Sequence, residues 1–140
     1  MDQKYYTHTM PNGIRVIHYQ NASEVAHFGL LVHTGTRDEL EEEHGLAHFM
    51  EHMFFKGTKK RSPYQIISRL EDVGGEINAY TTKEETAIYA SFLRSDFKKA
   101  MELIQDIFLH SLYAEKERKK EIEVIESEIQ TYEDTPSELI

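Results

Sequence analysis

The pattern of hydrophobic and polar residues predicts two β-strands near the start of the chain. Residues 14–19 follow a Pro-Asn-Gly turn and alternate as a half-buried β-strand does. Residues 25–33 carry a nearly continuous apolar run, which predicts a second and more buried strand. The following residues, 35–43, are polar and acidic and predict a loop.

Helical periodicity begins after this loop. Residues 44–55 carry apolar positions at helical spacing, and Gly57 predicts the stop of that helix. Ser62 followed by Pro63 is typical of an N-cap and a first helical position. A short helix over residues 64–72 should follow, closed by a pair of glycines.

The second half of the chain repeats the alternation of strands and helices. Residues 76–81 and 86–92 predict a β-hairpin. Ser95 should cap a helix that runs to about residue 111 or 112, and a highly charged helix should span residues 114–132. With 140 residues and no repeats or linkers, we expect one α+β domain. Its antiparallel-rich mixed β-sheet should pack against α-helices.

Composition and charge narrow the possible partners and cofactors. The absence of cysteine excludes disulfides and thiolate ligands, so a bound metal must use His, Asp or Glu. The net charge of −9 disfavours nucleic acid and anionic membranes and could attract basic peptides. No apolar run approaches the roughly 20 residues of a membrane helix. The first residues show no signal peptide, so we expect a cytoplasmic protein.

The segment His48-Phe49-Met50-Glu51-His52 is the most informative of the chain. Residues i and i+4 of a helix lie one above the other, so both imidazoles can reach one ion. Glu51 falls in the same polar arc, whereas an opposite, apolar arc should face the core. The members of the apolar arc are Leu46, Phe49, Met50, Met53 and Phe54. The alternative is that the polar arc is only the solvated face of an amphipathic helix.

A catalytic zinc needs a third protein ligand from a distant segment. The last predicted helix offers Glu121 and Glu128, which are seven residues apart on the flank of an apolar stripe. Spacing alone does not choose between these two carboxylates. The stripe consists of Ile122, Ile125, Ile129 and Tyr132. We expect the helix's other glutamates to be solvated, namely Glu115, Glu117, Glu123 and Glu126.

Several motifs, in order along nearly the whole chain, resemble the pitrilysin family of metallopeptidases, and more closely its branch of mitochondrial and bacterial processing peptidases. The matching segments are Gly13-Ile14-Arg15-Val16, Gly35-Thr36-Arg37-Asp38-Glu39, residues 45–58, residues 74–81, Glu121 and Val124-Ile125-Glu126-Ser127-Glu128-Ile129. The family motif continues to a glutamate about 76 residues beyond the second histidine, which here is Glu128.

The resemblance implies a zinc site and assigns its residues. His48, His52 and Glu128 would bind Zn²⁺, and Glu51 would act as the catalytic base. Glu121 would lie near the metal without binding it and would help to hold the zinc ligands in place. A structural zinc site would have four protein ligands and no open position, and it would not need a catalytic base such as Glu51.

The resemblance also implies a strand that binds the substrate and a second related domain or subunit. Asn78, Ala79 and Tyr80 would receive an extended peptide as an added β-strand, although the same residues could form an ordinary edge strand. The function would be that of a zinc endopeptidase. The alternative is a non-catalytic, peptide-binding partner subunit of a processing-peptidase-like complex. Residues 1–140 would be the N-terminal zinc-binding part of an enzyme completed by a second related domain or subunit.

Overall fold

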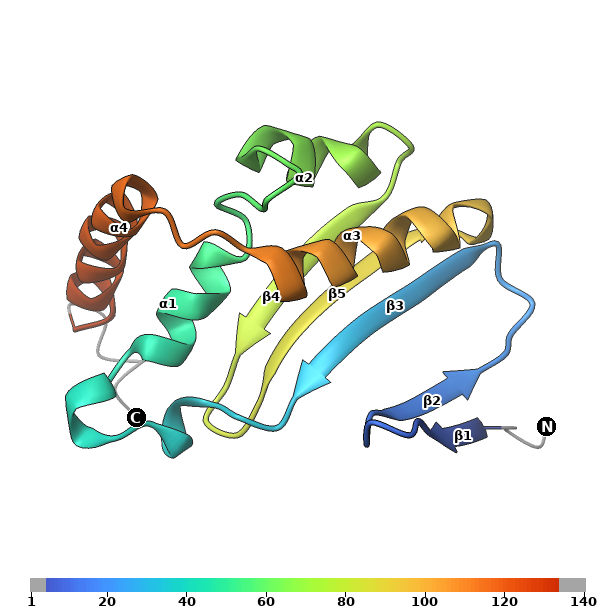
Figure 1. Cartoon of the computed structure of the whole chain (residues 1–140), viewed down its shortest axis with the longest axis horizontal. Helices are drawn as coiled ribbons and strands as arrows, with labels where there is room; N and C mark the ends of the chain where they lie inside the picture. The colour runs from blue at the N-terminus through green and yellow to red at the C-terminus, as the bar shows by residue number, and fades with distance from the viewer. Residues whose placement is uncertain (1–4, 134–140) are drawn as a thin grey trace.

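The computed structural model describes residues 5–133, with the side chains of residues 129 and 131–133 left out (Figure 1). Its strands are β1 (Tyr5–Thr9), β2 (Arg15–Tyr19), β3 (Val25–Val32), β4 (Glu76–Thr81) and β5 (Thr86–Leu93). Its helices are α1 (Leu46–Met53), α2 (Pro63–Glu71), α3 (Phe97–His110) and α4 (Glu115–Glu133). Short 3-10 helices cover Thr36–Asp38, Glu41–Glu43 and Arg94–Asp96. None of the helices within residues 5–133 is long and apolar enough to cross a membrane.

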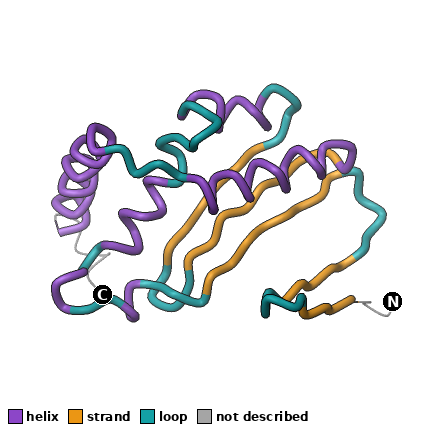
Figure 2. Tube along the Cα trace, viewed as in Figure 1, coloured by secondary structure: helices purple, strands orange, loops and turns teal. Residues whose placement is uncertain are grey.

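Two antiparallel sheets hold the strands. β3, β5 and β4 form one sheet in that order, so the predicted hairpin of β4 and β5 is confirmed. β1 and β2 form a separate hairpin, which lies apart from the larger sheet in Figure 2. The predicted α+β class with antiparallel sheets is therefore confirmed, and β4 is left at one edge of the larger sheet.

The hydrophobic core lies between the larger sheet and two helices. α3 contacts β3 and β5, while α2 contacts β4 and α3 (Figure 1). β5 contributes one alternating face of its strand, as period-two side-chain geometry requires. The main core residues are Phe54, Ile66, Leu70, Ile77, Ile88, Ala90, Phe92, Ala100, Leu103, Ile104 and Ile107.

Two strands have more exposed residues than their sequences suggested. β3 is more buried than β2, as predicted, but it alternates between half-buried and exposed residues, because no described element covers its second face. β2 is exposed throughout instead of half-buried. β1, its partner, is a strand that the sequence patterns did not predict, because its polar and aromatic residues carry no clear alternation of hydrophobicity.

Several helix ends also differ from the prediction. α1 begins at Leu46 rather than at residue 44, and Leu46 itself is 45% exposed instead of facing the core. The N-cap of α3 is Asp96, because residues 94–96 form a 3-10 helix and displace the predicted cap, Ser95. In α4, Ile125 is buried but Ile122 is exposed. The side chains of Ile129 and Tyr132 lie outside the described residues.

A buried polar cluster anchors the segment after α1 to α3. Asp106 of α3 accepts hydrogen bonds from Thr58 and Arg61, and its other oxygen lies 3.2 Å from His110 Nδ1. Arg61 Nη2 also donates to both carboxylate oxygens of Glu102, at 2.9 and 2.7 Å. The Asp106 side chain is only 1% exposed. Burial alone would raise the pKa of Asp106, but the Thr58 and Arg61 hydrogen bonds outweigh it and lower that pKa.

Candidate metal centre

The position of α1 is fixed at its first turn. Gly45 precedes the helix with φ 90°, a left-handed conformation that glycine adopts without strain. The Glu39 carboxylate accepts hydrogen bonds from the backbone N–H groups of Gly45 (2.9 Å) and Ala47 (2.7 Å). The hydroxyl of Thr81, at the end of β4, donates to the Ala47 carbonyl. α1 is thereby tied both to the preceding loop and to β4.

α1 places its two predicted histidines on the side that faces α4. The Nε2 atoms of His48 and His52 are 3.0 Å apart, and their rings are nearly perpendicular, at 88°. α1 and α4 contact each other, as Figure 1 shows. This contact brings Glu128 Oε2 to 3.7 Å from His48 Nε2 and 3.6 Å from His52 Nε2. Two nitrogen atoms of α1 and one oxygen atom of α4 thus converge on one point.

The geometry and chemistry of these donors fit zinc. Two imidazole nitrogens and one carboxylate oxygen lie within 4.8 Å of one another. Ligand atoms bound tetrahedrally at about 2.0–2.1 Å from a zinc ion are about 3.3 Å apart, close to the observed separations. Three protein donors leave a fourth position for water, which is the pattern of catalytic rather than structural sites. The side chains of His48 and Glu128 are 34% and 40% exposed, so a ligand can reach the point where the donors meet.

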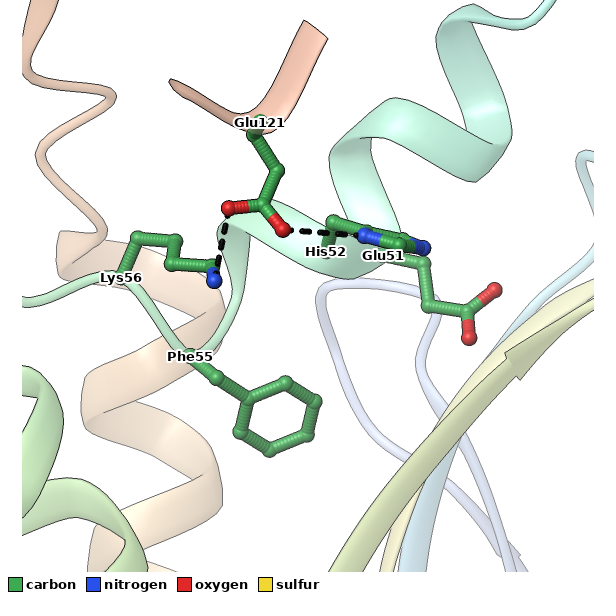
Figure 3. Close-up of a pocket in the computed structure, with 5 residues that line it drawn as sticks. All are labelled: Glu51, His52, Phe55, Lys56 and Glu121. Atoms are coloured by element: carbon green, nitrogen blue, oxygen red, sulfur yellow. Dashed lines mark hydrogen bonds and ion pairs between the residues drawn. The ribbon is translucent and has the colours of Figure 1, made fainter. Parts of the chain in front are cut away.

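Glu121 lies behind His52, on the side away from Glu128. Its Oε1 is 3.1 Å from His52 Nδ1, and its Oε2 is 2.6 Å from Lys56 Nζ (Figure 3). Although Glu121 is only 4% exposed, the hydrogen bonds from Lys56 and His52 outweigh the effect of burial and lower its pKa. A carboxylate at Nδ1 favours the tautomer with hydrogen on Nδ1 and leaves the Nε2 lone pair free for a metal.

Glu51 occupies a different position from the three converging donors. It is half-buried, and in Figure 3 its carboxylate points away from Glu121 and Lys56. Among the described residues this carboxylate has no hydrogen-bond or ion-pair partner. Glu51 lines a cavity of about 230 Å³ together with His52, Phe55, Lys56 and Glu121. A carboxylate that adjoins His52 but lies outside the donor cluster can accept a proton without occupying a metal position.

The predicted substrate strand lies next to α1. β4 contacts α1 and pairs with β5 on its inner side, and no described strand pairs with its outer edge. The Asn78 and Tyr80 side chains are exposed, whereas Ala79 packs against the core. The Tyr80 hydroxyl donates to Glu85. An extended peptide could therefore hydrogen-bond with the backbone of this edge.

Two residues of the site had no role assigned from the sequence. Glu39 ends one of the segments that resemble the family, but its place in an acidic loop suggested no role, and its side chain is only 6% exposed near the start of α1. Lys56 follows His52 by four residues, and that spacing is the one sequence signal that could have suggested a shared partner. His44, two residues before α1, is exposed and lies outside the donor cluster.

Similarity to known proteins extends over most of the chain. The sequence pattern of the family described as insulinase (peptidase family M16) matches residues 15–140. The uncharacterized zinc protease YmxG of Bacillus subtilis is 40% identical over 135 residues, which cover 95% of this chain and 33% of that protein. The probable mitochondrial-processing peptidase subunit beta of Arabidopsis thaliana is 39% identical over 94% of this chain and 25% of its own length. This chain thus spans about a third or less of these relatives.

The fold has a matching solved structure. The crystal structure of a protease from Helicobacter pylori superposes with a TM-score of 0.93 and covers 98% of this chain and 34% of that protein. At 24% identity this likeness supports the fold alone. The motif resemblance in the sequence, the family match and the curated relatives agree with one another. The chain therefore belongs to the insulinase (M16) family of peptidases, the family of pitrilysin and the processing peptidases.

Proposed function

We propose that this chain is the zinc-binding part of an endopeptidase that hydrolyses extended peptides. His48, His52 and Glu128 would hold the Zn²⁺ ion. The observation that carries the proposal is the convergence of their three donor atoms within 4.8 Å, and Glu51 lines a cavity together with one of these donors, His52. Zinc protease relatives support the choice of metal.

The chemistry follows from the donors and the free carboxylate. Zinc, when bound, would lower the pKa of a bound water to about 7 and polarise the scissile carbonyl. Glu51 would accept a proton from the attacking water on its carboxylate and later deliver it to the leaving amine. An intact base beside an intact donor set favours this reaction over the alternative of a non-catalytic partner subunit.

The edge of β4 would hold the substrate. A peptide added along Asn78, Ala79 and Tyr80 would continue the antiparallel sheet and lie next to α1. The net charge of −9 would favour basic peptides.

We also propose that a second related domain or subunit covers the site, since the curated relatives are longer. Holding a substrate in the reactive orientation can lower the activation barrier by roughly 7–11 kcal/mol. The second domain or subunit would contribute to this orientation.

The proposal is tested by metal removal and replacement. We expect about one zinc per chain by elemental analysis, a stoichiometry that follows from the one set of three donors found within residues 5–133. Cleavage of a quenched fluorescent basic peptide should be lost after dialysis against a chelator and return on addition of zinc. Magnesium, which prefers oxygen ligands, serves as the control ion and should not restore it. Cleavage that survives complete removal of metal would refute the proposal.

A second expectation concerns Glu121. Glu121→Gln should weaken zinc binding by roughly 10–100-fold without abolishing it, because a neutral amide holds the His52 ring less firmly and makes it less basic. A competition titration against a chelator measures the effect. Glu123→Gln, an exposed change on the same helix, is the matched control. If both variants bound zinc with equal affinity, Glu121 would have no role in supporting the zinc ligands.

A further inference from the structure

Lys56 lies just beyond α1, on the opposite side of Glu121 from His52. Its Nζ is 2.6 Å from Glu121 Oε2, while His52 Nδ1 is 3.1 Å from Glu121 Oε1 (Figure 3). Each oxygen of this carboxylate therefore has its own nitrogen partner. A carboxylate held at both oxygens has one orientation, and the hydrogen bond to His52 depends on that orientation.

Because the Glu121 carboxylate is buried, it needs the positive charge of Lys56. The Glu121 side chain is 6% exposed, and removing an ionised carboxylate from water is costly unless it is paired and hydrogen-bonded. Among the described residues, Lys56 is the only cation of Lys or Arg type that forms an ion pair with it. Without Lys56, Oε2 would lose its partner, and the carboxylate could turn toward water. Such a turn would move Oε1 away from His52 Nδ1 and weaken that hydrogen bond.

The backbone around Lys56 is itself anchored. The next residue, Gly57, adopts φ 118°, and its carbonyl accepts a hydrogen bond from the Leu112 N–H. The Lys59 N–H donates to the carbonyl of His110, the last residue of α3. The start of the lysine side chain is thereby fixed relative to both α1 and α3. Its ammonium group reaches Glu121 from a backbone segment that these hydrogen bonds hold in place.

We propose that Lys56 is a positioning residue for the metal site: it fixes the Glu121 carboxylate so that Glu121 holds the proton of His52 on Nδ1 and turns Nε2 toward Glu128 and His48. The role of Lys56 toward zinc rests on the proposed function, whereas its effect on the His52 proton does not require a metal.

The test compares Lys56→Met with Lys56→Arg in the full chain. Lys56→Met removes the charge with little change in length, and Lys56→Arg keeps it. Lys59→Met, an exposed neighbour, is the matched control. We expect Lys56→Met to weaken zinc binding about 10-fold, in the range of a lost supporting contact, while the arginine and control variants retain most of the affinity.

A second readout separates positioning from mere stabilisation of the fold. In the metal-free chain, the ¹⁵N shifts of the His52 ring should report hydrogen on Nδ1 in the wild type and a mixture of tautomers in Lys56→Met. A loss of stability alone would lower the melting temperature and leave these shifts unchanged. In the Glu121→Gln background, Lys56→Met should cause no further loss of zinc affinity, because the two changes remove the same contact.

The outcomes are distinguishable. Unchanged ring shifts together with unchanged affinity in Lys56→Met would overturn the role of Lys56 and leave the proposed function intact. Additive losses in the double variant would overturn it as well. If Lys56→Met fails to fold, the ring shifts and affinity of Lys56→Gln decide in the same way. A wild-type chain that binds no zinc would overturn the proposed function, and with it the role of Lys56 toward the metal.

Discussion

Replacing Glu51 with glutamine is expected to lower peptide turnover by a factor of about 10²–10⁴ and to leave the zinc content unchanged. The amide has nearly the shape of the carboxylate but cannot accept the proton of the attacking water. Glu51 also lies outside the cluster of His48, His52 and Glu128, so its loss removes no donor. Turnover of a fluorescent peptide and elemental analysis of the same sample measure the two quantities.

The donor residues should behave in the opposite way. His48→Ala is expected to lose the zinc as well as the activity, because two remaining donors cannot hold a catalytic zinc. Glu128→Gln should also lose zinc, whereas Glu126→Gln, an exposed change on the same helix, is the control that should keep it. If Glu51→Gln lost its zinc as fully as His48→Ala, the separation of base from ligands would be wrong.

Replacing Asp106 with alanine is expected to lower the free energy of unfolding by about 3 kcal/mol at neutral pH. The change leaves Thr58, Arg61 and His110 without the acceptor that the buried carboxylate provides. Arg61 keeps its ion pair with Glu102, which limits the loss. Denaturant unfolding followed by circular dichroism measures it, and Asp72→Ala, at an exposed site after α2, should cost far less.

The effect of Asp106 should depend on pH with a definite sign. Because hydrogen bonds lower its pKa in the folded chain, its contribution to stability is complete above the unfolded value of about 3.9. That contribution is lost as the pH falls through the lower, folded pKa. The stability difference between wild type and Asp106→Ala should therefore be constant near neutrality and shrink in strong acid. A difference that grew on acidification would contradict the assigned protonation state.

The sequence by itself determined the features that depend on local periodicity. The hairpin of β4 and β5 follows from alternating residues on either side of a polar turn, and the i, i+4 spacing of His48 and His52 places both rings on one side of α1. Family motifs then distinguished Glu128 from Glu121, which spacing could not do. The hairpin and the placement of the two histidines could be predicted because period and local turn chemistry act over a few residues, whereas the choice of Glu128 rests on the family resemblance.

Only the tertiary structure decided how distant segments meet. Contact between α1 and α4 turns Glu128 toward the two Nε2 atoms and Glu121 toward His52 Nδ1, and no local pattern encodes that packing. The pairing of Lys56 with Glu121 also appears only when the two segments are brought together. The exposure of β2 and of one face of β3 likewise depends on which elements cover them, so apolar residues alone predicted more burial than the described residues provide.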